Sequence, residues 1–328
     1  MDMISFGTVF LELVFGHLPE HPRPGEEVFT DDFAVSCGGA VTSASAAARA
    51  GIQAGLCTVL GNDLGSRVVR THCDREGVDL MPSIQVPRRS AGITVVLNFG
   101  GDRAFVTHLP PRPAGEQPEI DRWHDVLLRE RPRWCYLHAR PGAPGLLRAA
   151  RAAGVRVMLD TSPGEAWERD LVIECVRLAD VFVPNEAELR RVTGAQTLES
   201  AVSAAAAWGT PVVVKRGAAG ALVVEAGTVA EVRDGVQPVI ARDLTGAGDS
   251  FAGALIAGLL RGVPLAGAVV AANQAGSEAV CRLGAVGEVE MGSGSALDEL
   301  LTVAMAESSV AASIQGSRRP ATGPGSGA

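Results

Sequence analysis

Short apolar runs alternate with amphipathic or alanine-rich stretches through the second half of the chain. The runs expected to form buried strands are residues 134–138, 155–159, 180–184 and 211–215. A helical stretch separates each run from the next, and alanine-rich helices are expected at 197–208, 247–262 and 264–280. Short strands bounded by helices predict parallel strands with crossover helices, which is the pattern of an α/β fold.

The first third of the chain has a different pattern. Strands are expected at 11–16, 27–36, 93–98 and 103–108, and Phe99-Gly100-Gly101-Asp102 has the composition of a hairpin turn between the last two. A helix at 39–50, a strand at 54–60 and a helix at 63–76 that ends at Gly77 lie between them. We therefore expect a small antiparallel sheet inserted into the main domain, with strands within about 9–36 and 91–109. Such a sheet above the strand ends of an α/β core would act as a lid.

The length of 328 residues fits one large domain, here expected at 1–307, followed by a disordered tail at 308–328 that is rich in Ser, Gly, Ala and Pro. Glycine is abundant, with 39 residues, but no collagen-like period or repeat is present, so the glycines indicate many tight turns. The composition excludes collagen, coiled coil and a chain that is disordered throughout.

A net charge of −8 argues against a general binder of nucleic acid or of anionic membranes. The apolar stretch at 3–15 contains Glu12 and lacks the basic start of a signal peptide, and no run reaches the ~18 apolar residues of a membrane helix. The 6 cysteines form no C-x-x-C pair, which favours reduced thiols. A cytoplasmic protein is expected.

The segment most informative about chemistry is Gly246-Ala247-Gly248-Asp249, directly before an apolar helix. Small residues at a helix N-terminus let backbone N–H groups approach an anion, and the helix end adds partial positive charge. Asp249, in the first turn, could take the proton of a hydroxyl that attacks a bound phosphorus atom. A glycine-rich turn with Asp as a helix-start residue is the alternative interpretation.

Four motifs resemble the ribokinase-like (PfkB) carbohydrate kinases. Residues 243–249 resemble the D-T-x-G-A-G-D signature, with Leu244 at the second position. Gly38-Gly39 opens an alanine-rich helix, residues 184–188 resemble the N-x-x-E motif, and residues 215–220 resemble the nucleotide segment of the family. All four stand in the order and spacing of the family, and the resemblance covers roughly residues 3–290. It implies a ribokinase-like fold, with a mainly parallel sheet flanked by helices and a small β-sheet lid.

The resemblance also implies roles in binding ATP and Mg²⁺. Asp249 would be the general base, and the amides of Gly246, Ala247 and Gly248 would form the anion hole. Glu188 would organise Mg²⁺ through water, with Asn185 one helical turn away. Asn185 also suits a helix N-cap, and the two roles are compatible.

Further residues would hold the nucleotide and a monovalent cation. The nucleotide set is Lys215, Gly217, Gly220 and Asn273, and the possible K⁺ set is Asp243, Thr245 and Gly284. An ordinary glycine turn after a strand and a helix-surface Asn are the alternatives for the nucleotide set. Lys215 is the single lysine of the chain, so any role that needs a flexible ammonium falls on it.

On the acceptor side, Gly38 and Gly39 would let a sugar approach the backbone, and Glu12 takes the place of a sugar-binding Asp. Ser43 replaces the Asn of the family pattern, and Arg140 stands where some sugar kinases have an acidic residue. Arg140 is either a surface arginine or a sign of an acidic or phosphorylated acceptor.

Other enzyme classes lack their motifs here. No G-x-x-x-x-G-K-[ST], G-x-G-x-x-G or protein-kinase motif occurs. The string His17-Leu18-Pro19-Glu20-His21 fits a zinc-peptidase motif, but its prolines oppose the required helix, and a loop between lid strands is expected.

The sequence therefore predicts ATP-dependent phosphorylation of a hydroxyl on a sugar or sugar-like small molecule. A nucleoside kinase of the same fold and a non-catalytic sugar or nucleotide sensor remain the alternatives. Neither nucleic acid nor membrane is expected as a partner, and the lid could serve as a homodimer surface.

Overall fold

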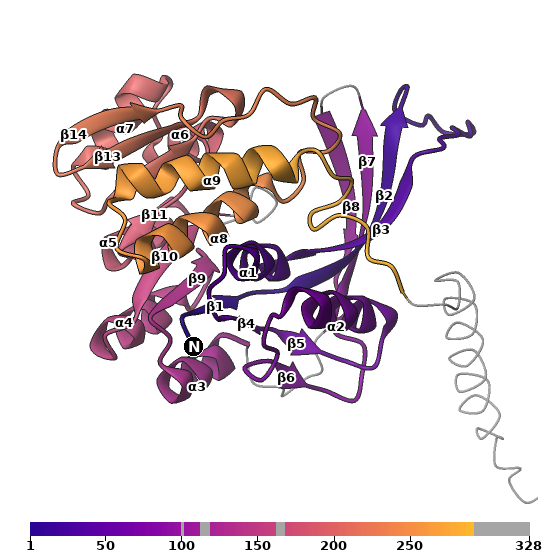
Figure 1. Ribbon diagram of the computed structural model, residues 1–328, viewed down its shortest axis with the longest axis horizontal. Helices are drawn as coiled ribbons and strands as arrows, with labels where there is room; N and C mark the ends of the chain where they lie inside the picture. Colours follow the sequence, from indigo (N-terminus) through magenta and orange to yellow (C-terminus); the bar gives the residue numbers. More distant parts are fainter. Residues whose placement is uncertain (100–101, 112–118, 162–167, 292–328) are drawn as a thin grey trace, which may run out of the picture. The chain divides into compact units, whose positions relative to one another are not determined.

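A computed structural model describes residues 1–99, 102–111, 119–161 and 168–291 of the chain (Figure 1). Residues Met1–Val289 form one compact unit. The expected tail at 308–328 and the centre of the expected hairpin turn, Gly100 and Gly101, lie outside the described residues. Within the described part, no helix has both the length and the apolar character needed to cross a lipid bilayer.

An eight-stranded sheet forms the centre of this unit, in the order β14-β13-β12-β11-β10-β9-β1-β4. The strands from β4 to β12 pair in parallel, which confirms the predicted parallel α/β core. Their bounds are β1 (Met3–Phe6), β4 (Ala54–Cys57), β9 (Trp134–His138), β10 (Arg156–Asp160), β11 (Val181–Phe182) and β12 (Val212–Lys215). An antiparallel hairpin of β13 (Ala221–Glu225) and β14 (Thr228–Val232) completes one edge, and the sequence pattern did not predict it.

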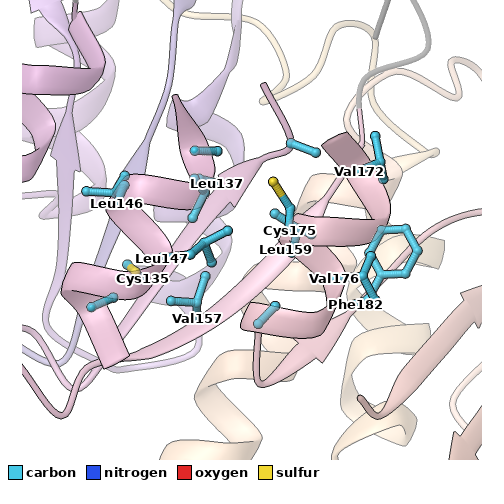
Figure 2. Close-up of a cluster of buried hydrophobic side chains, with 14 of the residues drawn as sticks. Cys135, Leu137, Leu146, Leu147, Val157, Leu159, Val172, Cys175, Val176 and Phe182 are labelled. Atoms are coloured by element: carbon cyan, nitrogen blue, oxygen red, sulfur yellow. The ribbon is translucent and has the colours of Figure 1, made fainter. Parts of the chain in front are cut away.

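Helices cover both faces of the central sheet, because the buried strands carry apolar side chains on each side. On one face, strand residues such as Leu137 and Leu159 pack against helices that follow the strands (Figure 2). These helices are α3 (Glu119–Glu130), α4 (Ala143–Ala152), α5 (Arg169–Leu178), α6 (Glu186–Thr193) and α7 (Leu198–Ala206). On the other face, α1 (Ala40–Arg49), α8 (Ala247–Leu260) and α9 (Leu265–Ala279) cover Tyr136 and Met158.

A separate four-stranded sheet corresponds to the predicted lid. Its order is β3-β2-β7-β8, with bounds β3 (Phe33–Gly39), β2 (Val9–Leu18), β7 (Gly92–Phe99) and β8 (Asp102–His108). The prediction of an antiparallel sheet is wrong for one pair, since β2 and β7 run parallel. The long connection between them, which contains α1 and β4, allows the parallel crossover.

Two strand boundaries also differ from the prediction. The strand expected at 27–36 begins at Phe33, because none of residues 27–32 is buried and three of them are acidic, which disfavours a strand. The strand expected at 54–60 divides into β4 and β5 (Val59–Leu60), and β5 pairs with β6 (Ile84–Gln85) beside α2 (Leu64–Glu76). The string from His17 to His21 spans the end of β2 and the loop after it.

The lid exposes three large apolar side chains, namely Phe33, Phe105 and Val106. The use of the lid as a homodimer surface stays a prediction.

Candidate active site

Polar side chains from three parallel strands meet the N-terminus of α8. Tyr136 and His138 come from β9, Asp160 ends β10, and Lys215 ends β12. The Tyr136 hydroxyl lies 2.9 Å from Oδ1 of Asp249 and 3.0 Å from Oδ2 of Asp160. Nζ of Lys215 donates to Oδ2 of Asp160 at 2.6 Å. Parallel strands end at one edge of a sheet, so residues far apart in the sequence share one half-buried polar cluster around Asp249.

The start of α8 has the geometry that the Gly-Ala-Gly sequence predicts. Gly246 is the N-cap with φ 76°, a left-handed conformation that favours glycine. The first N–H groups of a helix have no partner within the helix, although that of Ala247 makes a long 3.4 Å contact with the carbonyl of Leu244. A Cβ on Gly248 would lie 3.1 Å from Nζ of Lys215. An anion at this helix end would therefore meet backbone amides and one ammonium.

We expect Gly246→Ala to lower the free energy of unfolding more than the strain of a left-handed φ alone would, because a steric clash is added at this helix start. A Cβ at Gly246 would lie 2.7 Å from the carbonyl oxygen of Ala285, which is backbone and cannot rotate away. Gly262 is the matched control, because its φ is 78° but nothing lies within 4 Å of its Cβ position. Urea unfolding should show a loss of about 1 kcal/mol for Gly262→Ala and about 2–4 kcal/mol for Gly246→Ala. Equal losses would contradict the close approach of these two loops.

Charge in the cluster favours an ionised Asp249. Burial raises its pKa, but the nearby His138, the Lys215 ammonium and the Tyr136 hydroxyl together outweigh burial, and the pKa lies below its usual value. Burial lowers the pKa of His138, yet the carboxylates of Asp249 and Asp160 more than compensate and raise it overall. Burial also opposes the charge of Lys215, whose pKa is nevertheless raised by Asp160 and Glu188. Asp249 is thus a carboxylate beside the Lys215 ammonium and the His138 imidazole, which suits a proton acceptor that is ionised at neutral pH.

Asn185 and Glu188 form a capping box at the start of α6, which confirms the predicted N-cap. Oδ1 of Asn185 accepts from the Glu188 N–H at 2.9 Å, and Oε2 of Glu188 accepts from the Asn185 N–H at 2.7 Å. Burial and the charge of Asp160 raise the pKa of Glu188. Among the described residues, no three His, Cys, Asp or Glu side chains are grouped to hold a metal directly. The carboxylates of Glu188 and Asp160 fit Mg²⁺ that keeps most of its water and phosphate ligands.

Asp243 ties together the residues predicted to hold a monovalent cation. Its Oδ1 accepts from the backbone N–H and the hydroxyl of Thr245 at 2.9 and 2.7 Å, and its Oδ2 accepts from the Gly284 N–H at 2.8 Å. Both carboxylate oxygens therefore hold this loop pair together. A cation between the two loops would be held by their backbone carbonyl groups.

Glu12 links the lid to the same loop. It is 5% exposed, and its Oε2 accepts from the Ala285 N–H at 3.0 Å. A Cβ on Gly38 would collide with its carboxylate, so the glycine makes room for it. Burial raises the pKa of Glu12 to about 7, with further contributions from Asp243 and Asp249, against the lowering effect of the Ala285 hydrogen bond.

We expect stability to depend on pH through Glu12. The folded protein holds the Glu12 proton up to about pH 7, whereas the unfolded chain releases it near 4.5. The folded state therefore binds more protons in this window, so stability falls as pH rises from 5 to 8, by roughly 2–3 kcal/mol from this group. Glu12→Gln should remove that loss, and Glu20→Gln in the exposed loop after β2 should not. Urea unfolding curves at the two pH values test this, and parallel pH dependence of all three proteins would contradict it.

Several predicted site residues have other partners in the structure. The Ser43 hydroxyl is buried and lies 2.8 Å from that of Ser5, away from any open surface. Nδ2 of Asn273 donates to the carbonyls of Val232 and Asp234 and so fastens the segment after β14 to α9. The Arg140 guanidinium stacks over the Trp123 ring at 4.9 Å.

The predicted glycines are accounted for by backbone geometry. Gly39 has φ 81° and lies against the carbonyl of Thr8. Gly217 and Gly220 bound the short turn that follows Lys215. The ligand-binding roles of these glycines, and those of Ser43, Arg140 and Asn273, stay predictions.

Three residues of the cluster were not predicted from the sequence, namely Tyr136, His138 and Asp160. Each lies in or at the end of a strand that was predicted at nearly the right position. Tyr136 is the single tyrosine of the chain, and both Tyr136 and Asp160 are polar residues in otherwise apolar runs. Polar residues at the carboxyl ends of adjacent parallel strands were the signal that could have found them.

Comparisons with known proteins relate the chain as a whole to a family and a fold. A model of the pfkB family of carbohydrate kinases matches residues 16–290. A cytidine kinase of Thermococcus kodakarensis is 29% identical over 277 residues, which cover 81% of this chain and 91% of the relative. The structure of a fructokinase from Vibrio cholerae, described as bound to fructose, ADP and a calcium ion, has a TM-score of 0.70 and 25% identity, over 87% of this chain and 95% of that chain. The structure of an Arabidopsis thaliana ribokinase, described as complexed with ribose and ATP, has a TM-score of 0.71 and 22% identity over 87% and 94% of the two chains.

Proposed function

The chain belongs to the pfkB family of carbohydrate kinases, and on this premise we propose that it transfers the γ-phosphoryl group of ATP to a hydroxyl of a sugar or sugar-like molecule. The observation that carries the proposal is the placement of Asp249. Its carboxylate lies in the first turn of α8, directly after the Gly246–Gly248 amides, in a cluster that contains the Lys215 ammonium. Phosphoryl transfer needs these three parts together, namely a base, an anion cradle and a fixed positive charge.

In this mechanism, Asp249 takes the proton of the acceptor hydroxyl as that oxygen attacks the γ-phosphorus. The N–H groups of Gly246, Ala247 and Gly248 stabilise charge on the transferring group, and Lys215 lies beside them. Mg²⁺, when bound, neutralises charge on the phosphate oxygens, and Glu188 with Asn185 would hold its water ligands. The nucleotide would lie along the turn from Lys215 to Gly220, near Asn273.

The acceptor would lie between the lid and α8. Glu12 and the Gly38-Gly39 backbone would line this side. The 3.0 Å hydrogen bond from the Ala285 N–H to Glu12 connects the lid strand with the loop after α9. Closure of a lid over the acceptor would exclude water and suppress hydrolysis of ATP. The fructose and ribose named for the two neighbouring structures support a sugar in this place.

A nucleoside acceptor is the second candidate. The cytidine kinase relative is similar over 91% of its length, and a nucleoside presents a sugar hydroxyl to the same base. The acceptor, and not the phosphoryl-transfer machinery, separates the two candidates.

An ADP-release screen over pentoses, hexoses, sugar acids and nucleosides, with Mg²⁺ and with or without K⁺, tests the proposal. We expect acceptor-dependent ADP release with at least one class, and activity on nucleosides alone would favour the second candidate. Arg140→Ala should change the preference between a neutral sugar and its acid analogue if Arg140 contacts the acceptor. No acceptor-dependent release with any compound would contradict the proposed function and favour a sensor.

A further inference from the structure

A cavity lies between α1, α2, the start of β3 and residues 281–288, the segment that follows α9. Its volume is about 380 Å³, which is within the range of sites for small molecules. The side chains grouped around Asp249 do not line it, so it is separate from the candidate active site. Although the chain has a net charge of −8, four arginines line this arginine cavity, namely Arg49, Arg75, Arg242 and Arg282.

Two of these arginines are paired with carboxylates in the cavity wall. Nε and Nη2 of Arg49 donate to the two carboxylate oxygens of Glu76 at 2.7 and 2.9 Å. Nη2 of Arg242 donates to Oδ1 of Asp32 at 2.8 Å. These pairs join α1 to α2, and the start of β3 to the segment before α8, and so fix the shape of the cavity.

Arg282 differs from these paired arginines. Its Nε is buried and has no hydrogen-bond partner, and it forms no ion pair within the part of the chain that the structure describes. Burial, followed by the charge of Arg49, lowers the pKa of Arg282. A half-buried guanidinium that lacks a carboxylate and lies near a second guanidinium costs free energy, and a bound anion would recover it.

We propose that the arginine cavity binds the phosphate group of a small molecule, with Arg282 as its principal partner and Arg49 beside it. A guanidinium presents its N–H groups in a planar fork that matches phosphate oxygens. A phosphate monoester carries about −1.5 to −2 charges at pH 7, so a single group offsets two guanidinium charges. The volume of the cavity exceeds that of a phosphate group and leaves room for the molecule that carries it.

Residues 281–288 connect the arginine cavity with the proposed acceptor side. Arg282 and Val286 line the cavity, and between them the N–H of Ala285 donates to Oε2 of Glu12 at 3.0 Å. A ligand that pairs with Arg282 would steady this segment and, with it, the Glu12 carboxylate. Saturating ligand should therefore lower the KM of the acceptor about fivefold and leave kcat unchanged. This consequence alone rests on the proposed function, because binding in the cavity needs no phosphoryl transfer.

Calorimetric titration of the full chain tests the site. The probes are inorganic phosphate, glycerol 3-phosphate and 3-phosphoglycerate, added at constant ionic strength after ADP and Mg²⁺ have filled the nucleotide site. We expect one saturable site with a Kd of about 1 mM or lower for at least one probe. Equal affinity for all three would assign the site to free phosphate, and tighter binding of an ester would assign it to a phosphorylated metabolite.

Two substitutions should change this affinity in opposite directions. Arg282→Gln should weaken binding by about tenfold or more, because a charge-assisted hydrogen bond is lost. Glu288→Gln removes an exposed acid from the cavity lining and should tighten binding about twofold. Arg151→Gln, on the exposed side of α4, is the matched control and should bind like the wild type.

Urea unfolding separates a ligand site from a structural arginine. Arg282→Gln removes an unpaired cation, so without ligand its unfolding midpoint should equal or exceed that of the wild type, and the probe should raise only the wild-type midpoint. Glu288→Gln carries the test if Arg282→Gln does not fold.

No saturable binding to the wild type, or equal binding by the wild type, Arg282→Gln and Glu288→Gln, would overturn the site. Binding that leaves the acceptor KM unchanged would overturn its link to the acceptor. A wild type that binds the probe but transfers phosphate to no acceptor would overturn the proposed function and leave the site standing.

Discussion

Asp249→Asn is expected to lower kcat by about 10²–10⁴-fold, the contribution typical of a general base. The amide has nearly the same shape and can still accept from the Tyr136 hydroxyl, now 2.9 Å from Asp249 Oδ1, so the local packing should persist. It cannot take a proton from the acceptor at neutral pH. The affinity for ADP should stay within a few fold of the wild type, because a base in the proposed role would contact the acceptor side of the transferred group.

Initial rates at saturating ATP and acceptor, together with calorimetric titration of ADP, measure both effects. Asp121→Asn, on the exposed side of α3, is the matched control and should leave both unchanged. An Asp249→Asn protein that turns over at close to the wild-type rate would remove Asp249 from its role as base. A loss of ADP binding equal to the loss of rate would place Asp249 in nucleotide binding instead.

The second large effect is expected for Lys215→Met. The side chains of Lys215 and Asp160 are 14% and 4% exposed, so this is a buried ion pair, and its loss leaves Asp160 uncompensated beside Asp249 and Glu188. Breaking a buried pair in this way costs about 3–5 kcal/mol of the free energy of unfolding. Activity should also fall about 10²–10³-fold, because the ammonium beside Gly248 is lost from the anion site.

A second substitution separates these two effects of Lys215. Asp160→Asn in the same chain removes the unpaired charge, so Lys215→Met/Asp160→Asn should recover much of the stability but not the activity. Arg148→Met breaks the exposed pair with Glu174 on the α4–α5 surface and should cost less than about 1 kcal/mol. Urea unfolding and ADP-release rates on the four proteins test this, and full recovery of activity in the double variant would contradict a role for Lys215 at the phosphate.

The local parts of the fold could be predicted from the sequence. Residues 134–138 are β9 without change, and α2 ends at Gly77, in a left-handed C-cap, as the sequence indicates. Asn185 and Glu188 could be assigned to one helix start because a capping box depends on a spacing of three residues. These features depend on neighbours within one turn of helix or one strand.

The features that escaped prediction depend on contacts between distant segments. The parallel pairing of β2 with β7 follows from the path of the chain between them. The residues of the two strands do not themselves indicate whether the pairing is parallel or antiparallel. Four of the five residues of β14 are exposed, so it lacks the apolar alternation that reveals a strand. The sequence shows that Ser43 replaces the Asn of the family pattern. Only the packed structure shows that the Ser43 hydroxyl lies within hydrogen-bonding distance of the Ser5 hydroxyl.

The polar cluster around Asp249 shows the same limit. Tyr136, Asp160 and Lys215 come from three strands, and their shared site follows from strand order and not from spacing in the sequence. The motif predicted the helix start and the place of Asp249 in its first turn. The groups that set the charge of the Asp249 carboxylate could be found only once the order of the strands was known.

Transfer of the γ-phosphoryl group to an acceptor hydroxyl, with Asp249 as the base, can be followed through its phosphorus-containing products. The decisive measurement is phosphorus NMR of the full chain with ATP, Mg²⁺ and the acceptor found in the screen, run in parallel with Asp249→Asn. We expect the wild type to form ADP and a phosphate ester of the acceptor in equal amounts, while the variant forms neither at a comparable rate. Release of inorganic phosphate with ADP in place of the ester, or equal ester formation by both proteins, would contradict it.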